Sequence, residues 1–195
     1  MGEIRSAREI ALEKAEKLGK ATKEELDRAK YIPEGEKLAN NYLRNETNIL
    51  TELSKYPDEA KKYLISGAQS VLVRNLDLPK GDFIKKRNKM VLSGLKVLKQ
   101  DKVALENTFS KIRRLLEHFE GQGEQQRRQA YEMFRQEFEA QVSQAMQQQG
   151  MTAGGRFDVE RHPQFQEGWR QRSRQLDAQY LKLLDEYRQE ILSIS

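Results

Sequence analysis

The longest regular apolar pattern in this chain spans residues 83–120 and reads FIKKRNKMVLSGLKVLKQDKVALENTFSKIRRLLEHFE. Alternating three- and four-residue steps through this stretch meet only two polar residues, Asn88 and Lys102. Such sustained spacing is typical of a long helix with one buried seam. The positions of the seam are Ile84, Asn88, Val91, Leu95, Leu98, Lys102, Leu105, Phe109, Ile112, Leu116 and Phe119.

A helix of this length needs partners to cover its apolar face. At 1.5 Å per residue it would extend for about 55 Å, beyond an average globular helix. A second apolar row, formed by Phe83, Met90 and Val97, widens the arc and implies neighbours on two sides. We therefore expect residues 83–120 to form the central helix of a bundle. Asn88 and Lys102 would fix register, or Lys102 would extend its ammonium group outward.

The segments that follow supply two more long amphipathic helices. Residues 124–148 carry an aromatic and aliphatic stripe, and residues 163–193 carry another after His162-Pro163. The Gly121-Gln122-Gly123 sequence predicts a tight turn, which would fold the 124–148 helix back antiparallel to the central one.

The first half of the chain predicts shorter helices. Ser6 and Thr22 each open a capping-box pattern, and the second of these helices should end at Ile32 because Pro33 follows. Residues 33–75 predict a helical hairpin around Tyr56-Pro57. A Pro-Gly breaker then precedes residue 82, whose carboxylate is suited to cap the central helix.

The expected fold class is all-α, an elongated antiparallel helical bundle with coiled-coil-like packing around one long central helix. We expect short N-terminal helices in residues 1–32, a helical hairpin in residues 33–79 and the long-helix bundle in residues 80–195. The last two segments should form one structural unit.

Composition narrows the class of protein. The chain has 195 residues and no cysteine, which excludes disulfides and cysteine-based metal sites. Its first residues alternate polar with apolar side chains, and no stretch of about 18 apolar residues occurs. We therefore expect a cytoplasmic protein without a signal peptide or transmembrane segment.

Positive charge is concentrated in the predicted central helix. Residues 83–119 contain ten basic and three acidic residues, a net charge of +7, whereas the whole chain carries +5. A positive face of this kind suits a polyanion, an acidic protein or a membrane surface, although it is also typical of an ordinary solvated helix face. The candidate binding residues are Lys85, Lys86, Lys89, Lys96, Lys99, Arg113 and Arg114.

No motif in the sequence indicates catalysis. The two histidines, His118 and His162, are preceded three residues earlier by Leu115 and Val159, so neither forms the Glu-x-x-His pair of di-iron bundles. The glycine-rich segment near residue 150 lacks the lysine and hydroxyl residue of a phosphate-binding loop. We expect no catalytic residue, no metal site and no cofactor.

These observations favour a non-enzymatic helical interaction or scaffold protein, which acts through a protein partner or through self-association. The alternative is a nucleic-acid-binding protein that uses the basic face of residues 83–120. Peripheral membrane contact is not expected, because the apolar arc continues as a regular seam suited to other helices.

Overall fold

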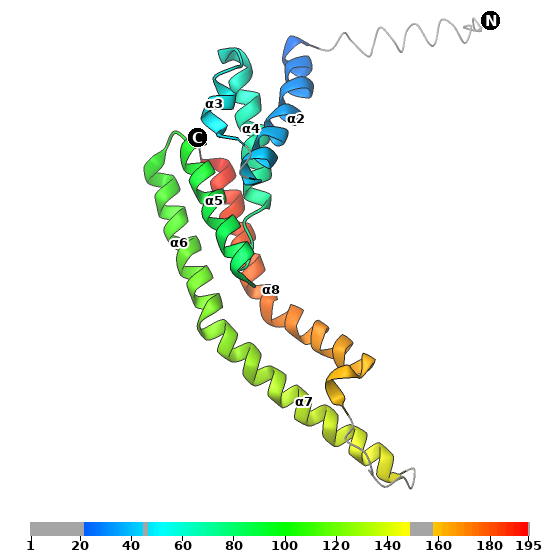
Figure 1. Ribbon diagram of the computed structural model, residues 1–195. Helices are drawn as coiled ribbons and strands as arrows, with labels where there is room; N and C mark the ends of the chain where they lie inside the picture. The colour runs from blue at the N-terminus through cyan, green and yellow to red at the C-terminus, as the bar shows by residue number, and fades with distance from the viewer. Residues whose placement is uncertain (1–21, 45–46, 149–157, 195) are drawn as a thin grey trace, which may run out of the picture. The chain divides into compact units, whose positions relative to one another are not determined.

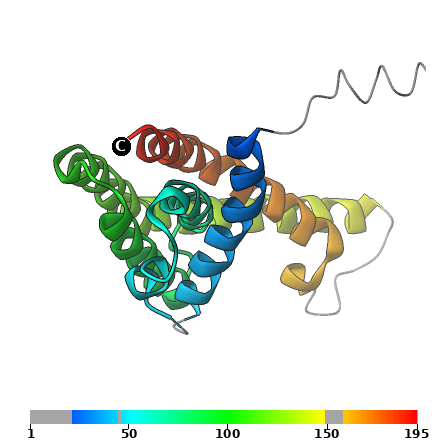
Figure 2. The same ribbon diagram turned by 90° about the horizontal axis from the view of Figure 1, so that it is seen from above.

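The computed structural model describes residues 22–44, 47–148 and 158–194. Helices account for the regular structure in these ranges, which contain no strand, so the all-α prediction is confirmed (Figures 1 and 2). The chain divides into two compact units, residues 1–71 and residues 72–195. The predicted helix that starts near Ser6 lies outside the described residues.

The first unit contains helix α2 (Lys23–Leu43), the short helix α3 (Ile49–Leu53) and helix α4 (Asp58–Arg74) up to residue 71. The capping box predicted at Thr22 is present. The Thr22 hydroxyl accepts a hydrogen bond from the backbone N–H of Glu25 at 3.2 Å, and the Glu25 carboxylate accepts one from the backbone N–H of Thr22 at 2.8 Å. Both groups satisfy otherwise unpaired donors at the helix start.

Helix α2 does not end at Ile32, as Pro33 had predicted, but continues through the proline to Leu43. The reason is a close crossing of α2 and α4. A Cβ atom on Gly35 would lie 2.0 Å from the Leu64 carbonyl oxygen, and one on Gly67 would lie 2.1 Å from the Ile32 carbonyl oxygen. Two glycines therefore let the helix backbones touch, and this packing overrides the local preference of the Pro33 position.

The prediction of one continuous central helix is wrong, because residues 83–120 form two helices. Helix α5 (Asp82–Leu98) and helix α6 (Lys102–Glu120) are separated at Lys99, whose backbone is extended. Asp101 caps α6, since its side chain accepts hydrogen bonds from the N–H groups of Val103 at 3.1 Å and Ala104 at 2.9 Å. The two helices form an antiparallel hairpin (Figure 1), so the apolar seam is shared between facing helices.

A side chain also caps the C-terminal end of α5. The Lys102 ammonium group donates to the carbonyl oxygens of Lys96 and Lys99, the last acceptors of α5. The carboxylate of residue 82, predicted as a cap, lies instead in the first turn of α5, and Gly81 occupies the cap position without a side-chain hydrogen bond. Lys102 thus terminates α5 rather than fixing the register of a continuous seam.

The long helix of this protein lies further along the chain. Helix α7 (Gln122–Gln148) continues α6 with a bend, and together they form a 47-residue helix. The predicted tight turn at Gly121 is therefore wrong. Gly121 donates to the Glu117 carbonyl at 2.9 Å and accepts from the N–H of Gln125 at 3.2 Å, so the helical hydrogen bonds pass through it.

Helix α8 (Pro163–Ser193) follows the single-turn 3₁₀ helix η1 (Val159–Arg161) and has the predicted bounds. It runs antiparallel to the long helix and packs on both of its halves (Figure 1). Ion pairs mark this register, with Lys111 2.8 Å from Glu190 and Arg172 3.3 Å from Glu137. The fully buried side chains along these helices include Leu105, Ile112, Phe119, Leu184 and Ile191.

Two polar side chains hold the segment before α5 in place. The buried Asn88 side chain accepts from the backbone N–H of Asp77 at 3.0 Å and donates to the Asp77 carbonyl at 2.6 Å. Arg188 donates to the carbonyl of Leu76. Asn88 therefore does fix a register, but of α5 against the incoming segment, because a buried backbone group needs a partner.

Candidate functional site

The seven predicted binding residues do not form one ridge. Five of them lie on α5 or at its end, and Arg113 and Arg114 lie on α6, which runs in the opposite direction. Three of the seven, Lys85, Lys99 and Arg113, form ion pairs or hydrogen bonds with other residues of the chain. The remaining four, which form no ion pair with any residue that the structure describes, are Lys86, Lys89, Lys96 and Arg114.

Two of the engaged cations are neutralised by carboxylates on α6. Lys85 lies 2.6 Å from the Glu120 carboxylate, and this hydrogen bond raises the pKa of the lysine. Arg113 pairs with Glu106 on its own helix, and its hydrogen bond lowers the pKa of that glutamate. Neither cation is available in full to an external anion.

The third engaged cation, Lys99, is a structural residue. It is only 3% exposed, and its ammonium group donates to the carbonyl oxygen of Ile194 at the end of α8. Burial lowers the pKa of Lys99. A cation at a helix C-terminus complements the helix dipole and satisfies a terminal carbonyl, so Lys99 joins α8 to the α5–α6 turn.

The unpaired lysines of α5 lie beside exposed apolar side chains. Phe83 is 67% exposed and Val97 is 43% exposed. At 100° per residue, these two side chains and those of Lys86, Lys89 and Lys96 project within one side of the helix, away from the buried Val91 and Leu95. We call this set, Phe83, Lys86, Lys89, Lys96 and Val97, the outer face of α5.

Sequence reasoning missed an ionic cluster in the second unit. Asp177 of α8 is 2% exposed, and its carboxylate lies 2.5 Å from the Lys80 ammonium group and 3.7 Å from the Arg127 guanidinium. Arg127 also lies over the Phe119 ring, 3.9 Å from its centroid. The spacing of seven residues between Asp177, Leu184 and Ile191 could have revealed that Asp177 is buried, because all three lie on the buried stripe of α8.

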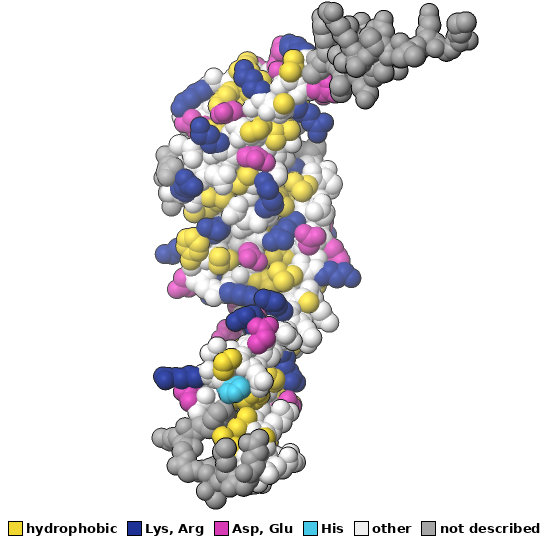
Figure 3. Space-filling view, turned by 90° about the vertical axis from the view of Figure 1, so that its right-hand side faces the viewer, with side chains coloured by type: hydrophobic (Ala, Val, Ile, Leu, Met, Phe, Trp, Pro, Cys, Tyr) yellow, Lys and Arg dark blue, Asp and Glu magenta, His cyan; other side chains and the backbone are white. Residues whose placement is uncertain are grey.

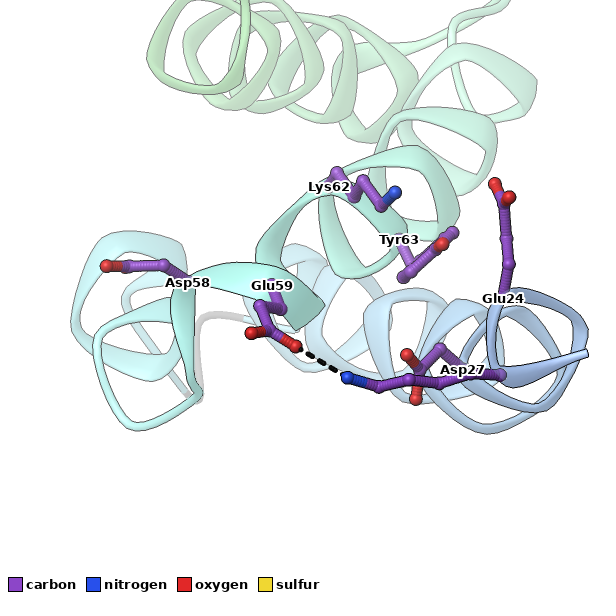
Figure 4. A pocket seen from close by; sticks show the side chains of 7 residues that line it. Glu24, Asp27, Asp58, Glu59, Lys62 and Tyr63 are labelled. Atoms are coloured by element: carbon purple, nitrogen blue, oxygen red, sulfur yellow. Dashed lines mark hydrogen bonds and ion pairs between the residues drawn. The ribbon is translucent and has the colours of Figure 1, made fainter.

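A second group of charges lines a cleft of about 570 Å³ in the first unit, between the start of α2 and α4 (Figure 4). Lys23 donates to Glu59 at 3.1 Å, and Glu24 and Asp27 lie nearby on α2. The Lys23 and Glu59 side chains are both 80% exposed. Solvent screens such pairs, so this cleft has the properties of an ordinary charged surface.

The histidines have structural contacts. The Nδ1 atom of His118 lies 2.9 Å from the Tyr180 hydroxyl, and His162 caps α8 by accepting from the N–H of Gln164. Within residues 22–44, 47–148 and 158–194, no group of three or more His, Asp or Glu residues is arranged to bind a metal.

On the face shown in Figure 3, positive and negative side chains are intermixed.

The fold and these surfaces define a helical protein whose described helices include no candidate membrane span. Comparison with protein families gives one assignment, a match over residues 50–193 to a family of unknown function, DUF6657. The match covers most of the chain, so the protein belongs to this family. No curated protein and no solved structure matches the chain.

Proposed function

We propose that this chain is a non-enzymatic helical interaction protein and that its contact surface is the outer face of α5. The observation that carries the proposal is the combination of exposed Phe83 and Val97 with three lysines that have no ion-pair partner among the described residues. Burial of exposed aromatic and aliphatic side chains supplies most of the affinity in protein interfaces, and charge complementarity supplies orientation.

The partner that fits this surface is an acidic amphipathic helix. Its apolar residues would cover Phe83 and Val97, and its carboxylates would pair with the lysines. A second copy of the same face fits poorly, because it would bring Lys86, Lys89 and Lys96 against like charges. The proposed packing of this partner on α5 would be coiled-coil-like, since Phe83, Met90 and Val97 are spaced by seven residues.

Nucleic-acid binding through the same helices remains the alternative prediction. It would rely on Lys86, Lys89, Lys96 and Arg114 alone, because the other predicted cations are engaged within the protein. A phosphate backbone carries regularly spaced charge, and its affinity grows with the number of cations that contact it. The short row of lysines on α5 therefore favours a partner that also covers apolar side chains.

A photo-crosslinking amino acid at position 83 of the full chain tests, in cells, both the proposed protein partner and the alternative of nucleic-acid binding. We expect a crosslinked acidic protein that persists after nuclease treatment and is lost in Lys86→Glu/Lys89→Glu. The matched control, Lys37→Glu/Lys182→Glu, changes the net charge equally at two exposed lysines outside α5 and should retain the product.

Other products would contradict the proposal. A nuclease-sensitive product would support nucleic-acid binding, and a product made only of two copies of this chain would support self-association. If crosslinking at position 83 is insensitive to the lysine reversals, the outer face of α5 is not a specific contact surface.

A further inference from the structure

A cleft of about 560 Å³ lies along α8 in the second unit, on the side that faces α7 and Lys80. Its lining includes Tyr131 of α7 and, on α8, Gln166, Trp169, Arg174 and Asp177. Residues 166 and 177 are eleven positions apart, which corresponds to about 16 Å of helix. The volume is within the range of small-molecule binding sites.

One wall of the cleft is aromatic and held in place by packing. The Tyr131 and Trp169 rings meet edge to face, with centroids 4.9 Å apart and planes at 80°. Behind them the Phe134 ring lies against Gly168, where a Cβ atom would be only 2.7 Å from the ring. Trp169 is partly exposed, and its indole N–H donates to no described residue. The wall therefore offers a fixed aromatic surface to a ligand.

Arg174 is the one charged residue lining the cleft that has no ion-pair partner among the described residues. Lys80 pairs with Asp177, and Arg170 pairs with Glu167 at 2.7 Å. Glu160, near the Gln166 end, lies 4.0 Å from Arg135, which also pairs with Glu132 and Glu139. Arg174 has no ion-pair or hydrogen-bond partner in the described part of the chain. Lys80 is itself 60% exposed, so its ammonium group keeps donors that face solvent. An anion would therefore be attracted to the Arg174 end of the cleft.

The opposite end of the cleft carries an oriented acceptor. The Gln166 side chain donates its amide N–H to the Glu160 carbonyl at 3.1 Å, and this bond fixes the amide. The Gln166 carbonyl oxygen accepts no hydrogen bond from the described residues. It is thus available to a ligand N–H group, such as the exocyclic amine of a nucleobase.

We propose that this cleft binds a nucleotide. The base stacks on Trp169, meets the Tyr131 ring edge to face and turns its amine toward Gln166, and the phosphate binds Arg174 and the exposed side of Lys80. Aromatic side chains beside cations are the combination that recognises unpaired bases with their phosphates. The ligand is either a free nucleotide or the base of a single strand, which present the same chemistry. This site is separate from the outer face of α5.

The test uses Trp169, the only tryptophan of the chain, as its own reporter. AMP and GMP are titrated into the full-length protein up to about 1 mM, which half-fills even a weak site. We expect saturable quenching of the indole fluorescence, and inorganic phosphate alone should compete at least tenfold more weakly. A short single-stranded oligonucleotide that binds more tightly than AMP and GMP would identify a strand as the source, whereas equal or weaker binding would identify the free nucleotide.

Variants separate the parts of the site. Arg174→Gln should weaken binding by about tenfold, as expected for the loss of one charge-assisted hydrogen bond. Trp169→Leu, measured by calorimetry, should weaken it by a similar factor because one stacking contact is lost. Arg128→Gln removes the same charge from an exposed position of α7 outside the cleft and should bind as the wild type does.

Several results would overturn the assignment. These are no saturable quenching by either nucleotide, equal competition by inorganic phosphate, or equal weakening by Arg174→Gln and Arg128→Gln. Lys86→Glu/Lys89→Glu should leave the titration unchanged, so failure of the α5 proposal and failure of this one give different data.

Discussion

The glycine crossing in the first unit gives the sharpest prediction of stability. Gly35→Ala places a methyl group 2.0 Å from the Leu64 carbonyl oxygen, and the Leu64 Cα and carbonyl carbon are also within 3 Å. All three neighbours are backbone atoms, which cannot rotate away as a side chain could. The α2 and α4 backbones must therefore separate by more than about 1 Å before the contact becomes an ordinary one.

The magnitude follows from two opposing effects. Overpacking of a buried contact costs about 1–3 kcal/mol, and a backbone neighbour places this case near the upper limit. Alanine is the better helix former by about 1 kcal/mol, which offsets part of the cost. The free energy of unfolding should therefore fall by about 2 kcal/mol in Gly35→Ala. With a urea dependence of about 2 kcal/mol per molar, the midpoint should fall by about 1 M.

Urea titration followed by far-ultraviolet circular dichroism measures this shift. Gly121→Ala is the matched control, because its Cβ would meet only the Glu117 carbonyl oxygen at 3.4 Å, and its φ is −89°. The control should be neutral or more stable by up to about 1 kcal/mol. A Gly35→Ala midpoint equal to or above the wild-type value would refute the close crossing of α2 and α4.

Three further predictions concern the second unit. Asp101→Ala removes the cap of α6 and should lower the free energy of unfolding by about 1 kcal/mol in urea titration; an unchanged value would show that the break after α5 does not depend on this cap. Hydrogen bonds from Lys111 and, to a smaller extent, from Thr108 lower the pKa of Glu190 below its ordinary value of 4.5. These hydrogen bonds therefore stabilise the fold above pH 4.5, and this stabilisation is lost as the pH falls through the lowered pKa. Lys111→Met should make the loss of stability below pH 4.5 shallower in acid titrations of the unfolding free energy, and an identical slope would contradict this assignment. Gly168→Val should force the Phe134 ring to move, change the wavelength of the Trp169 emission and lower the midpoint of thermal unfolding. If the emission and the midpoint are both unchanged, the aromatic wall is loosely packed.

The predicted binding residues show which features of a surface can be predicted from helical periodicity and which cannot. Helical projection correctly grouped Lys86, Lys89 and Lys96 on the solvent side of one helix, because that grouping depends only on the 3.6-residue repeat. It placed Lys99 on the same surface, although the chain leaves the helix there and the side chain is buried against the end of α8. The aromatic and charged cleft of α8 went unnoticed because Lys80 and Tyr131 come from segments distant in sequence.

The sequence by itself determined which segments are helical and how some of the helices begin. The capping box at Thr22 and the bounds of α8 depend on local hydrogen bonds and on apolar periodicity, which neighbouring residues supply. The all-α class follows from the same local information.

Only the tertiary structure decided where helices break and where they continue. The seam through residues 83–120 keeps its period across the break at Lys99, because two antiparallel helices that face each other both present an apolar side. Conversely, Pro33 and Gly121 are local breakers that remain inside helices, held there by packing of α2 on α4 and of α8 along the long helix. A helix end costs or gains only about 1–3 kcal/mol locally, so burial of a few side chains against a distant segment is enough to reverse it.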